Sequence, residues 1–177
     1  MSKLLWIPLL AAALLAGAQD PPALNERPAE MLKLDKLVGS WSGDGHWFAP
    51  GGEDRSWKGE SKGAWSLRGR YLELKTTVTS ANGTSENSAM ISWDRARQRY
   101  HAVLFFSNDS TPRMVAGEME GNKLVLSGPA ADEGSHLILT FTMESETKYT
   151  LLVQLAREEG DPIRVAEGSY TKKKEGS

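Results

Sequence analysis

The feature that most constrains the fold is an alternation of polar and apolar residues that continues along the chain from residue 39 onward. A two-residue period is typical of a β-strand with one buried face. About ten such segments follow one another at intervals of roughly 8 to 12 residues, which is the pattern of an all-β sandwich or barrel. The predicted strands lie within residues 39–47, 55–67, 70–80, 85–94, 99–107, 113–120, 122–128, 135–145, 148–158 and 163–173.

The connections between these segments are short enough for hairpins, and Asn82-Gly83 is a strong hairpin signal. An up-and-down order is therefore the simplest topology. Closing the sheet into a barrel removes its unpaired edges. We predict an antiparallel up-and-down β-barrel of about ten strands, and a barrel of that size encloses more room than side chains alone fill.

The first predicted strand contains Trp41 among three glycines, Gly39, Gly43 and Gly45, all at two-residue spacing and so on one face. A short helix predicted within residues 30–38 precedes it. In one interpretation Trp41 fills the closed end of the barrel and the glycines allow the strand to bend. In the other, the glycines form a cavity wall that a ligand approaches.

The first 18 residues have the three parts of a secretory signal peptide, with Lys3, an apolar run from Leu4 to Leu15, and small residues up to Ala18. Cleavage after Ala18 is the first interpretation and an uncleaved anchor the alternative, although the run is short for a membrane span. We predict export to the periplasm or outside the cell, with no stable membrane anchor after cleavage. The predicted organisation is a signal peptide (1–18), a proline-rich flexible linker (19–30), the barrel (31–174) and a disordered tail (175–177).

Composition argues against two classes of partner. A net charge of −2 gives no basic footprint for nucleic acid. The three histidines are scattered and there is no cysteine, so we predict no metal site. Ser61 stands in a Gly-x-Ser-x-Gly sequence, but that motif needs a strand, a sharp turn and a helix, and here it lies within an alternating segment. We therefore predict no catalytic residue.

Two charged residues have the same phase as apolar neighbours. Arg70 is at two-residue spacing from Leu72 and Leu74, and Glu167 is at two-residue spacing from Val165. Each charged residue is therefore expected on the same strand face as those apolar residues. If those apolar faces point inward, Arg70 and Glu167 lie inside the barrel, where buried charges must be paired. We hypothesise that they belong to a polar network that holds the polar head of a ligand. The alternatives are a structural salt bridge and a local bulge that turns one of them outward.

Several short motifs, taken in their order and spacing, resemble the bacterial DUF1579 family over residues 31–173. The matching residues are Leu34, Leu37, Gly39, Trp41 and Gly43, then Gly69-Arg70-Tyr71-Leu72, then Trp93-Asp94 with Tyr100, and finally Glu167, Tyr170, Thr171 and Lys172. The chain is also similar to calycins such as lipocalins and to nitrobindin-like barrels. This resemblance implies a calycin-like barrel.

The nitrobindin-like resemblance raises the question of haem. In those barrels a histidine three residues before the closing tyrosine ligates the iron, and Glu167 stands at that position here. A carboxylate is a poor haem ligand, so we predict no cofactor.

Together these observations predict an exported protein that binds a small apolar or amphipathic molecule inside its barrel. One alternative is an enzyme that uses an interior Glu167 as an acid or base. The other is a filled barrel that acts through its surface as an interaction module. The sequence leaves the oligomeric state open. The candidate ligand-binding residues are Trp41, Gly43, Arg70, Leu72, Leu74, Trp93 and Glu167.

Overall fold

The computed structural model describes residues 27–48 and 54–174. The predicted signal peptide, most of the predicted linker and the predicted tail lie outside these residues. The short helix α1 (Ala29–Leu32) begins before residue 31, within the segment predicted as linker. Arg27 forms an ion pair with Asp35 at 2.8 Å and lies 3.9 Å from the centre of the Trp65 ring. These two contacts tie Arg27 to the start of the barrel domain.

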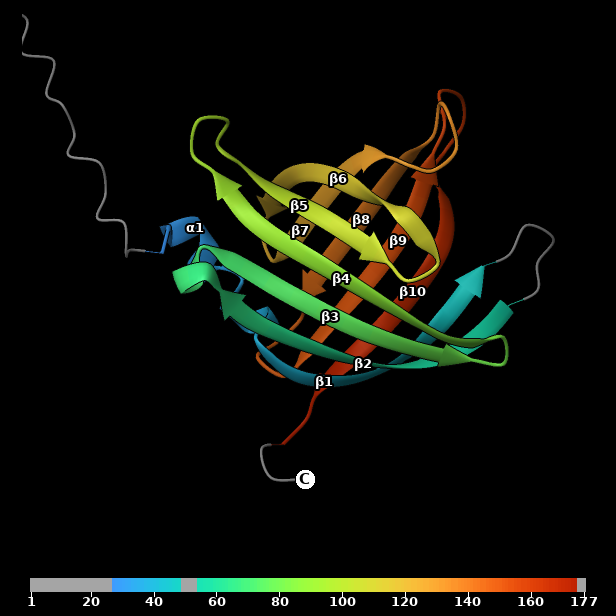
Figure 1. Ribbon diagram of the computed structural model, residues 1–177, viewed down its shortest axis with the longest axis horizontal. Coiled ribbons are helices and arrows are strands. Elements are labelled where there is room, and N and C mark those ends of the chain that lie inside the picture. The colour runs from blue at the N-terminus through green and yellow to red at the C-terminus, as the bar shows by residue number, and fades with distance from the viewer. Residues whose placement is uncertain (1–26, 49–53, 175–177) are drawn as a thin grey trace, which may run out of the picture.

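Ten strands close into one antiparallel barrel in which each strand pairs with its neighbours in sequence and β1 pairs with β10 (Figure 1). The all-β fold class, the strand number and the up-and-down order are confirmed. The strands are β1 (Gly39–Phe48), β2 (Asp54–Ser66), β3 (Tyr71–Ser80), β4 (Gly83–Asp94), β5 (Arg99–Phe106), β6 (Asp109–Glu120), β7 (Lys123–Pro129), β8 (His136–Met143), β9 (Lys148–Ala156) and β10 (Ile163–Lys172).

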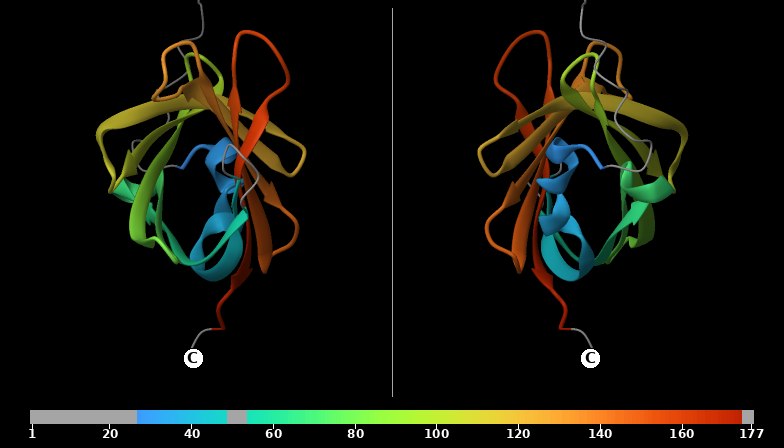
Figure 2. Two further views of the ribbon diagram at one scale, coloured as in Figure 1. Left: turned by 90° about the vertical axis from the view of Figure 1, so that its right-hand side faces the viewer. Right: turned by 90° about the vertical axis from the view of Figure 1, so that its left-hand side faces the viewer.

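The N-terminal helical segment closes one end of the barrel, and both views of Figure 2 show it across the lumen. It consists of α1 and the 3-10 turn η1 (Asp35–Leu37). Met31, Leu34 and Leu37 are fully buried there. Because these side chains pack against the strands, the segment is part of the hydrophobic core.

Two side-chain hydrogen bonds fix the helical segment to the barrel. The indole Nε1 of Trp41 donates to the carbonyl oxygen of Leu37 at 3.1 Å. The Tyr100 hydroxyl donates to the carbonyl oxygen of Glu30 at 2.7 Å. Trp41 is fully buried, so the prediction that it fills the closed end is confirmed.

One irregularity affects the site. The pairing of β10 with β9 shifts between Arg164 and Ala166, which is a β-bulge. After the bulge Ala166, Gly168 and Tyr170 are buried, and the residues between them face the other way. After the bulge, the residues of β10 that point inward are therefore not those found by counting in twos from the start of the strand.

Candidate functional site

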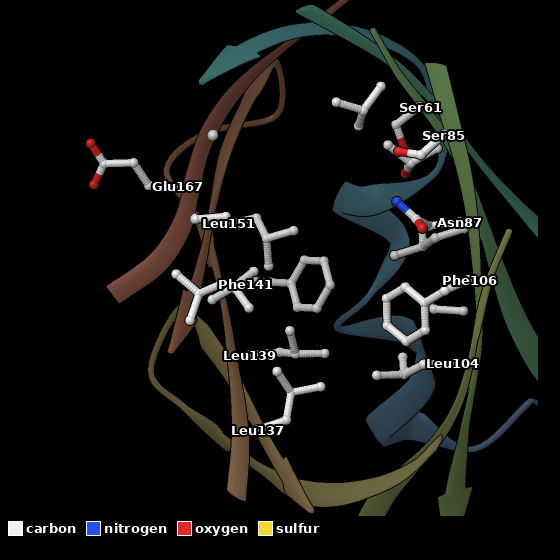
Figure 3. A pocket seen from close by; sticks show the side chains of 18 of the residues that line it. Ser61, Ser85, Asn87, Leu104, Phe106, Leu137, Leu139, Phe141, Leu151 and Glu167 are labelled. Carbon is white, nitrogen blue, oxygen red and sulfur yellow. The ribbon is translucent and has the colours of Figure 1, made fainter. Parts of the chain in front are cut away.

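A cavity of about 430 Å³ lies inside the barrel, between the closed end and the open end. Figure 3 shows side chains from opposite walls pointing into it. Its lining residues come from strands β1 to β6 and β8 to β10, because alternate residues of each strand point inward. Those that carry the argument below are Trp57, Ser61, Leu74, Thr76, Asn87, Leu104, Phe106, Arg113, Leu139, Phe141, Tyr149, Leu151 and Val153.

One wall of the cavity is apolar. Alternate residues of β8 and β9 supply it, and Figure 3 shows Leu139, Phe141 and Leu151 projecting toward the middle. Leu139 and Phe141 are largely buried. Phe106 and Leu104 extend the apolar surface from the opposite side. This surface favours an apolar ligand body, since covering it removes it from water.

The facing wall carries a row of polar side chains on three adjacent strands. Ser61 of β2 pairs in register with Thr76 of β3, and Thr76 pairs with Asn87 of β4. The Thr76 hydroxyl donates to the Ser61 hydroxyl oxygen at 3.0 Å. Ser61 is also a side-chain hydrogen-bond partner of Tyr149. Since directly paired residues point to the same face, the row presents one polar edge to the cavity.

The floor beneath this row is aromatic. Tyr149 and Tyr170 stack with their ring centres 4.7 Å apart and their planes at 9°. Burial raises the pKa of Tyr170 to about 12. Burial also raises the pKa of Tyr149 above its ordinary value. Both hydroxyls are therefore protonated at neutral pH and act as uncharged hydrogen-bonding groups.

Trp57 lies against a wall of glycines. A Cβ at Gly45 would lie 2.3 Å from its ring, and one at Gly168 would lie 2.4 Å from it. The indole occupies the space that those two residues leave by having no side chain. Trp57 is 6% exposed, and its Nε1 is buried without a hydrogen-bond partner in the described part of the chain. The first-strand glycines thus make room for a protein side chain rather than for a ligand.

Arg113 lies near the open end on the inner face of β6, paired in register with Leu104. Its guanidinium carbon is 5.2 Å from the centre of the Phe106 ring. It donates a hydrogen bond to the Asp109 carboxylate. This charge-assisted bond lowers the pKa of Asp109, so the carboxylate is ionised at neutral pH and offsets the positive charge of the guanidinium.

The structure separates the predicted site residues. Leu74 lines the cavity, and Glu167 also borders it, although its carboxylate points away (Figure 3). Trp41 and Leu72 are fully buried in the core, and Trp93 packs against Tyr100 with ring centres 4.9 Å apart. Gly43 faces the Tyr170 ring, since a Cβ there would lie 2.5 Å from it. Trp41, Gly43, Leu72 and Trp93 are not among the cavity-lining residues.

The interior placement predicted for Arg70 and Glu167 is wrong. Arg70 is exposed and caps the 3-10 turn η2 (Leu67–Gly69), so it does not share the alternation of β3. The carboxylate of Glu167 points away from the cavity in Figure 3, with a side chain 44% exposed and 3.4 Å from Arg164. The bulge in β10 is the cause, as it reverses the phase read from the preceding residues. The two charges therefore form no interior network.

The structure argues against both alternative functions, the enzyme with an interior Glu167 and the filled barrel. An interior acid or base at Glu167 loses its geometric basis because the carboxylate is on the outer surface. A filled barrel has no cavity, and this barrel has one. The Gly-x-Ser-x-Gly motif lies inside β2, which continues to Ser66, and so does not form a nucleophile elbow.

The sequence analysis does not identify the polar row. Ser61 stands in a motif that gives no nucleophile elbow, yet its side chain lies in the cavity wall. A signal was present: Thr76 stands between Leu74 and Val78 at two-residue spacing, so it shares their inward face. Polar residues that share the inward face with apolar neighbours, on several adjacent strands, indicate a polar wall.

The fold is a closed, ten-stranded antiparallel barrel that encloses a cavity. The chain belongs to the DUF1579 family, described as a protein of unknown function, whose model matches residues 28–172. No curated protein matches the sequence. The barrel is similar to the crystal structure of Rv2717c from M. tuberculosis, with a TM-score of 0.65 and 15% identity over 84% of this chain and 100% of that one.

A second similar structure is the S-type phycobiliprotein lyase CPES from Guillardia theta. Its TM-score is 0.56, with 9% identity over 82% of this chain and 98% of that one. At such identities both similarities show the fold alone.

Two further observations concern the described residues only. None of their helices is long and apolar enough to cross a membrane. They contain no group of three or more histidine, aspartate or glutamate side chains placed to hold a metal ion.

Proposed function

We propose that this protein binds a small amphipathic molecule non-covalently inside its barrel. The observation that carries the proposal is a cavity with an apolar wall on β8 and β9 and a polar row on β2 to β4. Ligand pockets are mostly apolar, with a few placed polar groups that fix orientation. A volume of about 430 Å³ falls within the ~300–1,000 Å³ of known ligand pockets.

The proposed ligand enters from the open end. The helical segment blocks the other end with fully buried side chains, whereas the cavity lining reaches Trp47, Arg113 and Leu155 near the strand termini opposite it. The apolar lining supplies the affinity by removing ligand surface from water. The polar row supplies the orientation.

A pair of neighbouring substitutions on β9 tests the proposal. Val153 lines the cavity, and Gln154 faces the other way in the strand alternation. We expect wild-type protein to bind the uncharged fluorophore N-phenylnaphthylamine with a blue-shifted emission. Val153→Trp fills the cavity and should weaken binding at least about tenfold, a change of roughly 1.4 kcal/mol. Gln154→Trp should leave the affinity unchanged.

Equal fluorophore affinities in all three folded proteins would contradict the proposal, because the probe would then bind elsewhere. Thermal unfolding of each variant confirms that it is folded.

Export is part of the proposal. The support is the sequence of residues 1–18, with its positive start, apolar run and small residues before the cleavage point. The barrel then works in the periplasm or outside the cell. The intact mass of protein purified from its host reports the cleavage, which should leave Gln19 as the first residue.

A further inference from the structure

We infer that the ligand is an uncharged molecule whose hydrogen-bonding groups lie along one edge, and that this edge rests on the polar row of β2 to β4. The inference rests on the proposed function and adds the chemical class and orientation of the ligand. In a barrel that binds the polar head of a ligand at its open end and the apolar tail in its interior, the lining changes from polar to apolar along the barrel axis. Here the lining changes from polar to apolar across the barrel axis, from one wall to the other (Figure 3).

The polar groups are placed side by side rather than in depth. Ser61, Thr76 and Asn87 occupy one register line across three neighbouring strands. Adjacent strands are about 4.8 Å apart, so the line offers hydrogen-bonding groups at intervals that match substituents on one edge of a ring system. Figure 3 shows Ser61 and Asn87 on this wall; Ser85, also labelled there, pairs with Val78 and so lies nearer the open end than this line.

Asn87 has unused hydrogen-bonding capacity in this line. Its side chain lines the cavity and is half-buried. Within the described residues its amide has no hydrogen-bond partner, unlike the linked hydroxyls of Ser61 and Thr76. An amide offers two donors and an acceptor. It can therefore bind a hydroxyl or a carbonyl group on the ligand without a charge on either side.

The charges of the lining favour an uncharged ligand. Arg113 is the ionised side chain that points into the cavity within the described chain, and its partner Asp109 neutralises it. The Glu167 carboxylate points away. Transferring an unpaired charged group from water into such a cavity is costly, whereas a hydroxyl or carbonyl group loses little when it is hydrogen-bonded.

Three matched naphthalenes test the inference. The first is naphthalene itself. The second is naphthalene-2,7-diol, which has both hydroxyls on one long edge, and the third is the isomer naphthalene-2,6-diol, which has them on opposite edges. All are uncharged at neutral pH. Affinities are measured by displacement of N-phenylnaphthylamine from wild-type protein. We expect the one-edge diol to bind about tenfold more tightly than its isomer, because two or more hydrogen bonds form at once.

Two variants locate the contact, and one serves as a control. Thr76→Val and Asn87→Leu keep the side-chain shape and remove the polar groups, so each should reduce the preference for the one-edge diol to less than about threefold. Naphthalene should bind each variant at least as well as wild type. Thr77→Val makes the same exchange on the exposed face of β3 and should leave every affinity unchanged.

Two results would overturn the inference alone: equal affinities of the two diols for wild type, or a preference that persists in both folded inner-face variants. If neither the fluorophore nor any naphthalene bound, the cavity would not be a binding site and the proposed function would fail with the inference. Because Thr76→Val is nearly isosteric, it remains informative if Asn87→Leu lowers the unfolding temperature too far for the assay.

Discussion

At the scale of single residues, the barrel wall around Trp57 shows why the first strand is rich in glycine. A Cβ at Gly45 would lie 2.1 Å from the carbonyl oxygen of Glu167 as well as against the indole. Distances this short require the backbone to move. Gly45 therefore leaves room for Trp57, and Gly43 leaves room for the Tyr170 ring. The glycines around Trp41 are explained by protein side chains that the strand pairing brings beside them.

A pair of glycine substitutions tests this explanation. Gly45→Ala should lower the free energy of unfolding by about 3 kcal/mol, at the upper end of the range for overpacking. Gly59→Ala is the milder comparison, since a Cβ there would lie 3.1 Å from the carbonyl oxygen of Thr77 and 3.2 Å from the Trp57 ring, and it should change the free energy of unfolding by less than about 1 kcal/mol. Urea unfolding followed by tryptophan fluorescence measures both. Similar values for the two variants would mean that the glycines do not make room for Trp57.

At the scale of elements, the helical segment before β1 acts as a lid built into the core. Leu34 is fully buried beneath it, whereas Leu32 of the same segment is 51% exposed. Burying an apolar side chain removes it from water and packs it against the strands. The segment is too short to be a stable helix by itself, so these tertiary contacts hold it in place.

The contrast between these two leucines gives a prediction. Leu34→Ala should destabilise the protein by about 2–5 kcal/mol, through lost burial and the space left behind. Leu32→Ala should cost less than about 1 kcal/mol. Since Leu34 does not line the cavity, we expect folded Leu34→Ala protein to bind N-phenylnaphthylamine with unchanged affinity. A weakened affinity would show that the closed end and the cavity are coupled.

At the scale of the whole molecule, closure of the sheet buries three tyrosines whose ionisation opposes folding at high pH. Burial raises the pKa values of Tyr100, Tyr149 and Tyr170 above the ordinary value of 10.0, and those of Tyr100 and Tyr170 to about 12. A raised folded-state pKa gives stability that is complete below pH 10 and is lost as the pH rises toward 12. The unfolded chain releases the protons first, which draws the equilibrium toward unfolding.

The expected loss is about 4 kcal/mol per pH unit above pH 10 from the three groups together, since each pKa unit corresponds to about 1.36 kcal/mol. Urea unfolding at several pH values above and below 10 measures the slope. Tyr170→Phe should lower the slope by about a third while retaining a ring against Tyr149. A free energy of unfolding that does not change between pH 10 and 11 would contradict this account.

The sequence by itself determined the architecture. Ten alternating segments with short connections define ten strands, and local joins leave little choice but to pair neighbours. The burial of Trp41 followed from the same alternation. These features depend on side-chain period and turn chemistry, both of which are local in the chain.

The tertiary structure alone decided the site. The bulge between Arg164 and Ala166 turns Glu167 outward, and η2 removes Arg70 from the strand alternation. Strand alternation does not predict the inward face beyond such points, because one extra residue turns every later side chain to the opposite face of the sheet. The empty space inside also depends on how residues from different strands meet, as when Trp57 fills the room beside Gly45. Packing across the barrel, which no single segment encodes, therefore sets which wall is polar and where a ligand fits.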